Sequence, residues 1–344
     1  MEQNPRIRHD LAPPSEAEIL LQVRNLRTYF RLDEGMLKAV DGISFSVYRH
    51  RVLGMVGESG CGKSVTAQSL LQIVPKPGTV QGEMMWYGRT PAVDIGSLDP
   101  ESEEMRSIRG NEIAMIFQEP MTAFSPVHTV GNQLMEAYFV HGNMDKIAAR
   151  ERAIELLALV GIPAADRRVD EYTFQLSGGM RQRAMIAMAM MNRPQMLIAD
   201  EPTTALDVTI QAQILRLIRR LQAETGTAVL YITHNLGVIA NLADDIAVMY
   251  RGKIVETGTV RQVLKSPKHP YTVALLRSIP GFGAQRGERL QSIRGTVGVP
   301  IDPPDECPFH SRCDHFIPGR CDLTMPASVE VAPGHQVACV LYEA

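Results

Sequence analysis

Apolar and polar positions follow two different periods along the chain. Short apolar runs rich in β-branched residues are typical of strands. They predict strands at residues 19–23, 43–47, 51–56, 195–198, 228–233 and 246–250. Apolar residues spaced three or four apart predict helices at residues 64–73, 147–160, 180–191 and 210–224. Because strands alternate with helices, we expect an α/β fold with a mainly parallel sheet.

The same pattern divides the chain into segments. From about residue 121 to 193 it is helical, which predicts a helical subdomain inserted into the α/β core. Residues 1–17, which mix charges with prolines, are expected to be a flexible leader. After residue 265 proline, glycine and cysteine become frequent and the periodicity fades. We therefore predict a core domain at residues 18–265 and a loop-rich extension at residues 266–344.

Composition and charge set limits on the partners of the chain. Hydrophobic residues make up 45% of the 344 residues, charged residues 21%, and the formal net charge is −3 at pH 7. This balance gives no general attraction to nucleic acid or to an anionic membrane. No run approaches the roughly 18 apolar residues of a membrane-spanning helix, and the start lacks the apolar stretch of a secretory signal. We expect a cytoplasmic chain, anchored by another subunit if it works at a membrane.

Residues 57–64 fit the pattern of a phosphate-binding loop, G-x-x-x-x-G-K-[ST]. Glycines let the backbone curl so that successive N–H groups point at phosphate oxygens, and the following helix adds its positive N-terminal end. Lys63 is expected to reach the β- and γ-phosphates, and the Ser64 hydroxyl to bind Mg²⁺. The predicted nucleotide contacts in this loop are Gly57, Glu58, Ser59, Gly60, Cys61, Gly62, Lys63, Ser64 and Val65.

Polar side chains that could convert nucleotide binding into hydrolysis follow three of the apolar runs. Asp200 ends the run at 195–199 and suits the Mg²⁺ shell, while the adjacent Glu201 could orient or deprotonate the attacking water. His234 follows the run at 228–233, where an imidazole could contact the γ-phosphate. Gln118 follows the run at 113–117 and is suited to sensing Mg²⁺ and water.

A second anion-binding motif begins the helix predicted around residue 180. Residues 176–183 read Leu-Ser-Gly-Gly-Met-Arg-Gln-Arg, so that a serine and two glycines stand at the helix N-terminus. One nucleotide has no obvious use for two phosphate cradles on the same chain. An N-terminal capping serine with a flexible turn is the simpler interpretation of this segment taken alone.

Over residues 19–260 these motifs resemble those of the ATP-binding subunits of ABC transporters, in the order usual for that family. They are the Walker A loop 57–64, the Q-loop residue Gln118, the signature 176–180, the Walker B strand 197–200 with Glu201, the D-loop Ala205-Leu206-Asp207 and the switch residue His234. The resemblance implies a P-loop ATPase fold with an N-terminal antiparallel β region and a helical signature subdomain.

The resemblance also implies a head-to-tail dimer of two ATPase subunits. In that arrangement the signature of one subunit contacts the γ-phosphate bound by the Walker A loop of the other, which gives the second cradle a use. The implied contacts in trans are Ser177, Gly178, Gly179 and Met180. The family also stacks an aromatic residue from the start of the chain on adenine, and its spacing from residues 25–26 favours Phe30 over Tyr29.

Within the family the chain looks like the D-type ATPase of dipeptide and oligopeptide importers. The similarity lies in residues 57–65, 115–122, 176–183 and 269–272, and in the cysteine-rich end. It implies a second, different ATPase, two transmembrane permease subunits, an extracytoplasmic binding protein, and a place on the cytoplasmic face of the membrane. Related systems import nickel complexes or oligosaccharides. Soluble ABC ATPases acting on nucleic acid or ribosomes carry coiled-coil insertions or a second ATPase unit, which this sequence lacks.

Four cysteines gather at the end of the chain, whereas Cys61 stands alone in the phosphate loop. They are separated by five, seven and seventeen residues: Cys307, Cys313, Cys321 and Cys339. Zinc sites prefer cysteines two to four residues apart, so the wider spacing favours a [4Fe–4S] cluster. Four-cysteine tails of similar ATPases are associated with such a cluster. Zinc held by cysteines together with His310, His315 or His335, and free thiols, remain alternatives.

Overall fold

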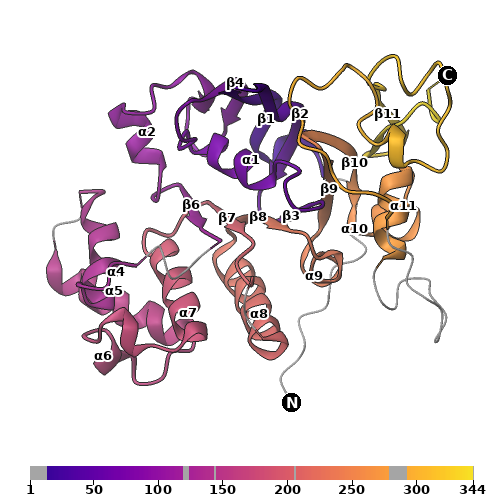
Figure 1. Cartoon of the computed structure of the whole chain (residues 1–344). Coiled ribbons are helices and arrows are strands. Elements are labelled where there is room, and N and C mark those ends of the chain that lie inside the picture. Colours follow the sequence, from indigo (N-terminus) through magenta and orange to yellow (C-terminus); the bar gives the residue numbers. More distant parts are fainter. Residues whose placement is uncertain (1–13, 119–123, 143–144, 205–206, 279–292, 344) are drawn as a thin grey trace. The chain divides into compact units, whose positions relative to one another are not determined.

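A computed structural model describes residues 14–118, 124–142, 145–204, 207–278 and 293–343. The chain forms two compact units, the first made of the residues up to Ser97 with those from Tyr231 onward, and the second of Leu98–Leu230. Figure 1 shows the first unit in indigo and in orange to yellow, because it joins the two ends of the sequence. The domain boundary near residue 265 stays a prediction, and most of the expected leader, residues 1–13, lies outside the described residues.

The first unit contains an antiparallel sheet of four strands in the order β2-β1-β4-β5. Its strands are β1 (Ile19–Leu32), β2 (Gly35–Tyr48), β4 (Gly78–Trp86) and β5 (Val93–Asp94). The predicted strands at 19–23 and 43–47 are the outer ends of β1 and β2, which pair antiparallel along most of their length. This sheet confirms the N-terminal antiparallel region that the family resemblance implies.

The first unit also contains strands of a second sheet, which lie in the order β11-β12-β10-β9-β3-β8. Its strands are β3 (Val52–Val56), β8 (Ala228–Thr233, which begins in the second unit), β9 (Asp245–Tyr250), β10 (Lys253–Thr259), β11 (Ser328–Ala332) and β12 (His335–Ala338). β3 and β9 pair parallel and every residue in them is buried, as expected of strands covered on both faces. β10, β12 and β11 add antiparallel pairs, so the C-terminal extension contributes two strands.

Helices and short turns complete the first unit. The helices are α1 (Lys63–Leu70), α9 (Leu236–Leu242), α10 (Val260–Lys265) and α11 (Pro270–Arg277), and the 3-10 turns are η1 (Glu16–Glu18), η2 (Ile95–Ser97) and η4 (His310–Arg312). The predicted helix at 64–73 is therefore shorter by one turn at its end.

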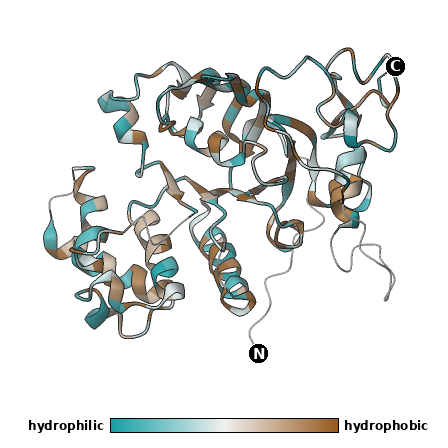
Figure 2. Cartoon of the chain, in the orientation of Figure 1, coloured by the Kyte–Doolittle hydropathy of each residue, from teal (hydrophilic) through white to brown (hydrophobic). Residues whose placement is uncertain are grey.

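The second unit holds two parallel strands and most of the helices. Its elements are α2 (Glu103–Ile108), β6 (Ile113–Ile116), α4 (Val130–Phe139), α5 (Lys146–Leu159), α6 (Ala165–Arg168), η3 (Thr173–Gln175), α7 (Gly178–Ala189), β7 (Met196–Asp200) and α8 (Val208–Thr225). α4, α5 and α7 pack against one another. Figure 2 shows separate apolar and polar faces on α8, whose buried residues include Ile214, Leu217, Ile218 and Leu221. The helical signature subdomain is thus confirmed.

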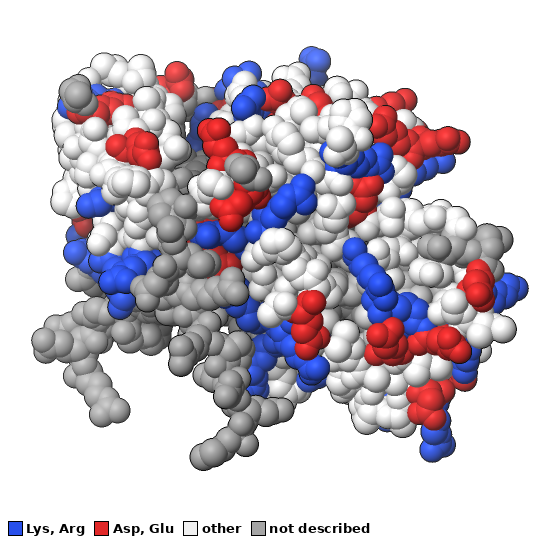
Figure 3. Space-filling view, turned by 180° about the vertical axis from the view of Figure 1, so that it is seen from behind, with Lys and Arg blue, Asp and Glu red and all other residues white. Residues whose placement is uncertain are grey.

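The surface agrees with the small net charge. Figure 3 shows acidic and basic side chains interspersed on the face in view. Within the described part of the chain, no helix is long and apolar enough to cross a membrane.

A buried ion pair fixes β3 and β9 at the point where both strands begin. Arg51 donates from Nε and Nη2 to the two carboxylate oxygens of Asp245, at 2.8 and 2.9 Å. The adjacent Asp244 accepts the Val52 N–H at 2.8 Å. Both charges are therefore satisfied by hydrogen bonds, as a buried pair requires. Because β3 leads directly into residues 57–62, this pair also helps to fix the position at which that loop begins.

A buried polar cluster ties the C-terminal extension to β10. Glu256, which is 1% exposed, accepts the N–H groups of Lys268 and His269 at 2.8 and 2.9 Å and contacts His335 Nε2 at 2.8 Å. His269 caps α11 by accepting the Tyr271 N–H at 3.0 Å through Nδ1. Burial lowers the pKa of His269 to about 4, while the charge of Glu256 acts against this shift. The imidazole is therefore neutral in the folded protein.

The neutral His269 predicts a loss of stability in mild acid. The folded-state pKa lies below the ordinary value of 6.5. The unfolded chain therefore binds more protons between these values, and the free energy of unfolding falls as the pH falls through that window. From pH 7 to 5 this group should remove about 2 kcal/mol. His269→Asn keeps a capping side chain without the titration. Its melting temperature should decline less from pH 7 to 5 than that of the wild type, and an equal decline would contradict the assignment.

Candidate functional site

The loop 57–62 is built so that only glycine fits at its key positions. Gly60 and Gly62 have φ of +78° and +105°, a region that favours glycine. A Cβ at Gly62 would collide with the Ala39 carbonyl oxygen, and one at Gly57 would collide with the Met249 carbonyl oxygen. The loop therefore curls against the backbones of β2 and β9 and delivers the chain into α1.

Lys63 opens α1 and its side chain folds back over the loop. Its Nζ donates to the carbonyl oxygens of Gly57 and Glu58, at 2.9 and 3.1 Å. The residue is 4% exposed, so its ammonium charge is kept at the loop by these two oxygens. Ser64 follows in the first turn of the helix.

Cys61 has a packing role in this loop. It is fully buried, and burial raises the pKa of its thiol. A neutral buried thiol is a small apolar group and a poor ligand.

Tyr29 and Phe30 point to opposite faces of β1, as neighbours in a strand do. Thr28 Oγ1 lies 2.7 Å from Ser69 Oγ of α1, which shows that this face of β1 meets the helix after the phosphate loop. Phe30 is two residues further along and shares that face, with its ring against Gly78. Phe30 is therefore on the side of the sheet that carries α1.

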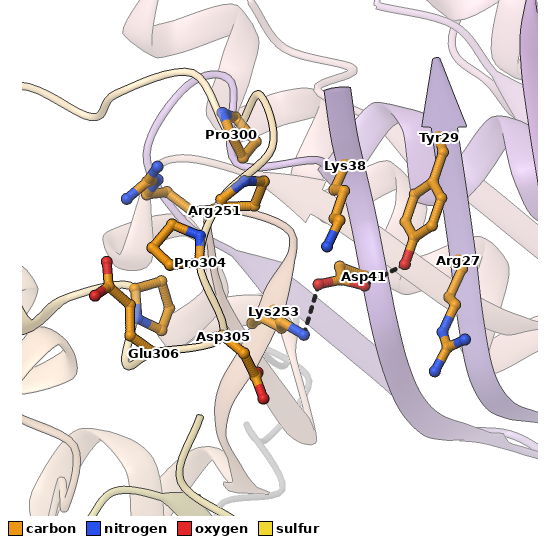
Figure 4. Close-up of a pocket in the computed structure, with 12 residues that line it drawn as sticks. Arg27, Tyr29, Lys38, Asp41, Arg251, Lys253, Pro300, Pro304, Asp305 and Glu306 are labelled. Carbon is orange, nitrogen blue, oxygen red and sulfur yellow. Dashed lines mark hydrogen bonds and ion pairs between the residues drawn. The ribbon is translucent and has the colours of Figure 1, made fainter. Parts of the chain in front are cut away.

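Tyr29 lies instead in a pocket of about 320 Å³ on the other face. Figure 4 shows its hydroxyl and the Lys253 ammonium directed at Asp41, with Pro300 and Pro304 of the extension on the opposite wall. Burial, followed by the hydrogen bond to Asp41, raises the pKa of Tyr29 to about 12. The tyrosine is thus engaged in a polar site away from α1.

In the second unit the structure brings three predicted residues to one edge of a strand pair. β6 and β7 are parallel with Ile116 opposite Ala199. Asp200 and Glu201 follow Ala199, and Gln118 lies two residues past Ile116, so all three stand at the C-terminal ends of adjacent strands. Asp200 is 3% and Glu201 9% exposed. Glu201 has a φ of +43°, which is unusual for a residue other than glycine and is common at functional sites.

The signature motif forms a capped and exposed helix start. Ser177 is the N-cap of α7 and accepts the Met180 N–H at 3.3 Å. Ser177 and Gly178 are exposed, and a Cβ at Gly178 would meet no atom within 4 Å. The backbone at Ser177 and Gly178 is therefore open to a ligand from outside the chain, while the Met180 N–H is engaged by the cap.

The remaining predicted residues occupy element ends. Asp207 caps α8 by accepting the Ile210 N–H at 2.9 Å, while Ala205 and Leu206 of the D-loop lie outside the described residues, as do residues 119–123. His234 is exposed directly after β8. Lys63, Ser64, Phe30 and His234 belong to the first unit, and Gln118, Asp200, Glu201, Ser177 and Asp207 to the second.

The four C-terminal cysteines gather in one part of the extension. Cys307, Cys321 and Cys339 are 5 to 7% exposed, and the other three thiols lie near enough to Cys307 to contribute to its raised pKa. Each sulfur also accepts a backbone N–H. Phe309 donates to Cys307 and His315 to Cys313. Ile317 donates to Cys321 and Leu341 to Cys339. Burial raises the pKa of Cys307 to about 12.

These thiols do not form the site of a single ion. Across the described ranges, no group of three or more His, Cys, Asp or Glu side chains is placed to hold one metal ion. A tetrahedral zinc would bring its four sulfurs to about 3.8 Å from one another, given zinc–sulfur bonds near 2.3 Å. The [4Fe–4S] cluster predicted from the cysteine spacing, like zinc, therefore finds no assembled ligand group among the described residues.

Comparison with known proteins decides the family. The family model of ABC transporters matches residues 40–204, and that of the oligopeptide/dipeptide transporter C-terminal region matches residues 255–321. The probable peptide ABC transporter ATP-binding protein y4tR of Sinorhizobium fredii is 50% identical over 326 residues, covering 94% of this chain and 95% of that relative. This chain belongs to the ABC transporter family.

Other members of the family agree with this assignment. The dipeptide transport ATP-binding protein DppD of Bacillus subtilis is 46% identical, covering 95% of this chain and 96% of its own. A dimeric post-hydrolysis structure of the ATP-binding cassette MJ0796, bound to ADP and Pi, is 25% identical with a TM-score of 0.61 and covers 70% of this chain and 99% of its own. The chain is thus an ATPase of the ABC transporter family, and its resemblance to dipeptide and oligopeptide importers is confirmed.

Two residues that contact the loop 57–62 were missed by the sequence analysis. Arg312 pairs with the Glu58 carboxylate, and the Tyr271 hydroxyl accepts the Glu58 N–H. Tyr271 lies in the His-Pro-Tyr-Thr segment that supports the family resemblance, but that segment carries no local sign of a contact with a loop more than 200 residues earlier.

Proposed function

We propose that the chain is the ATP-hydrolysing subunit of an importer for dipeptides or oligopeptides at the cytoplasmic face of the membrane. The observation that carries the proposal is the match of residues 255–321 to the C-terminal region of oligopeptide/dipeptide transporters, next to a complete set of ATPase motifs. Relatives at 45 to 50% identity over most of the chain have names of peptide transport proteins. These relatives favour peptides over nickel complexes or oligosaccharides as cargo.

The predicted roles of the site residues follow from their chemistry. Lys63 holds phosphate oxygens and His234 contacts the γ-phosphate. Ser64, Asp200 and Gln118 hold Mg²⁺, which neutralises charge on the β- and γ-phosphates when bound. Glu201 orients and deprotonates the attacking water. The strand ends that carry Gln118, Asp200 and Glu201 together support this assignment.

The exposed signature supports an active site shared between two ATPase subunits. Ser177, Gly178, Gly179 and Met180 present the start of α7 outward. In the proposed head-to-tail dimer they contact the γ-phosphate on the Walker A loop of a second ATPase, and Asp207 lies at the same interface. The further partners are two transmembrane permease subunits and an extracytoplasmic binding protein.

The C-terminal thiols support a [4Fe–4S] cluster as a bound group. Each of the four sulfurs accepts a backbone N–H, and hydrogen bonds to the sulfurs tune such clusters. Cys307, Cys313, Cys321 and Cys339 would hold it. The cluster would cross-link a segment that has few strands and helices of its own.

Replacement of Glu201 tests the hydrolytic role. Glu201→Gln keeps the shape but removes the base, so the ATPase rate should fall at least about 100-fold while the Kd for ATP stays within about threefold. Glu224→Gln, on an exposed carboxylate paired with Arg220 in the same unit, is the matched control and should leave the rate unchanged. Full hydrolysis by Glu201→Gln would overturn the assignment.

The adenine contact is tested by a pair of variants on β1. Phe30→Ala should raise the Kd for ATP about tenfold, because base stacking on an aromatic ring contributes roughly 1–3 kcal/mol. Tyr29→Ala removes the ring that lies in the pocket on the opposite face and should change the Kd less than about twofold. The reverse outcome would move the adenine to Tyr29.

Iron analysis tests the cluster. Protein purified without oxygen should contain about four iron atoms per chain and absorb visible light. Cys321→Ser should lose the iron, whereas Cys61→Ala should keep it because Cys61 lies in the phosphate loop. Stoichiometric zinc without iron in the wild-type protein would rule out the cluster.

A further inference from the structure

Arg312 of the C-terminal extension forms an ion pair with Glu58 of the phosphate loop. Arg312 donates from Nη1 and Nη2 to the two carboxylate oxygens of Glu58, at 2.8 and 3.1 Å. The Arg312 side chain is only 6% exposed and that of Glu58 27%. Two parallel hydrogen bonds between a guanidinium and a carboxylate fix both distance and orientation. The pair therefore holds the second residue of the Walker A loop in one place.

Tyr271, from α11, holds the backbone of the same residue. Its hydroxyl accepts the Glu58 N–H at 3.0 Å. Tyr271 is fully buried, and its ring packs on Tyr250 and Phe309 with centroids 4.6 and 5.3 Å away. Because the ring cannot move easily in this packing, the hydroxyl is a fixed anchor. Glu58 is thus held through its side chain and through its N–H.

Glu58 in turn supports Lys63. The Glu58 carbonyl oxygen is one of the two oxygens that accept hydrogen bonds from the Lys63 ammonium. A displacement of Glu58 would shift this carbonyl and the curl of the loop around it. Glu58 therefore links the extension to Lys63, the lysine that is expected to bind the phosphates.

Arg312 is itself held by the folded cysteine segment. Its Nε donates to the Arg294 carbonyl oxygen at 2.7 Å, and its guanidinium carbon lies 5.7 Å from the Tyr250 ring centroid and 6.0 Å from that of Phe309. Arg312 ends the short turn η4 and precedes Cys313, while the Cys307 N–H donates to the Cys321 carbonyl oxygen at 2.9 Å. The Arg312 side chain is therefore held from three places: the Arg294 backbone, Tyr250 of β9 and Phe309 of the cysteine segment.

We propose that Arg312 is a positioning residue for ATP binding: it keeps the Walker A loop in the phosphate-receptive shape by holding Glu58. This inference rests on the proposed function of residues 57–64 as the nucleotide-binding loop. The C-terminal extension would then help to keep the ATP-binding conformation of the loop. Its folding would set the fraction of molecules that are ready to bind ATP. The apparent Kd rises in inverse proportion to that fraction.

A contact that only attaches the extension to the loop would give a different experimental result. If the pair served only to attach the extension, its loss would lower the melting temperature and leave the affinity of the folded protein for ATP unchanged. A positioning role changes the Kd and KM for ATP while the rate at saturating ATP is kept, because bound ATP restores the loop.

The test compares full-length Arg312→Ala with a matched variant in the same segment. Arg312→Ala should raise the Kd for a fluorescent ATP analogue with Mg²⁺ roughly tenfold, and the KM for ATP in parallel, with kcat within about twofold. Arg312→Lys keeps the charge without the bidentate fork and should recover part of the affinity. Arg320→Ala is the control, because Arg320 also precedes a cysteine but pairs with Glu343, at 3.7 Å, instead of the phosphate loop. Its Kd should equal that of the wild type.

A further variant, Tyr271→Phe, keeps the test decisive if Arg312→Ala unfolds the extension, and a double variant extends the test if Arg312→Ala folds. Tyr271→Phe keeps the packed ring and removes only the acceptor of the Glu58 N–H, so a several-fold rise in Kd is expected. Glu58→Gln combined with Arg312→Ala should be no weaker than Arg312→Ala alone, because both act through one contact.

The outcomes separate this inference from the proposed function. Wild-type affinity in folded Arg312→Ala or in Tyr271→Phe, or fully additive losses in the double variant, would overturn the positioning role alone. A wild-type chain that binds no ATP would overturn the proposed function and this inference together.

Discussion

The phosphate loop is the constraint on which the rest of the first unit depends. Its backbone must present N–H groups inward, and this requires glycine at positions where a side chain would strike the carbonyls of Ala39 and Met249. The Arg51–Asp245 pair sets the direction of the strand that enters the loop. Tyr271 and Arg312 then fix Glu58 from the far end of the sequence. Contacts from four separate stretches of the chain therefore hold this loop of backbone in one shape.

This arrangement changes how the C-terminal extension is understood. It adds β11 and β12 to a core sheet, is joined to β10 by the buried Glu256 cluster, and lines the pocket at Tyr29 through its prolines. The turn that ends in Arg312 connects its cysteine segment to Glu58 of the Walker A loop. The signature, in contrast, is exposed at the start of α7. In the proposed head-to-tail dimer it would contact a nucleotide held by another subunit.

Features with a local cause were predictable. The buried run at 228–233 coincides with β8, because a continuous apolar run suits a strand covered on both faces. The phosphate loop and the capped start of α7 were visible as short motifs. The strands β10, β11 and β12 were not predicted. In β10 the buried Glu256 makes the sequence look polar, because its partners His269 and His335 are distant in the chain. The Arg312–Glu58 pair and the left-handed backbone of Glu201 depend on tertiary contacts, for which one sequence gives no signal.

The central claim is that this ATPase works as part of a membrane importer. The most direct measurement is purification of the tagged full-length chain from membranes of its own organism, followed by mass spectrometry of the stoichiometric partners. We expect two proteins with several transmembrane helices each, together with a second ABC ATPase, and ATP hydrolysis per chain well above that of the isolated subunit. Recovery of the chain with ribosomes or nucleic acid, or hydrolysis at the same rate with no membrane protein bound, would contradict it.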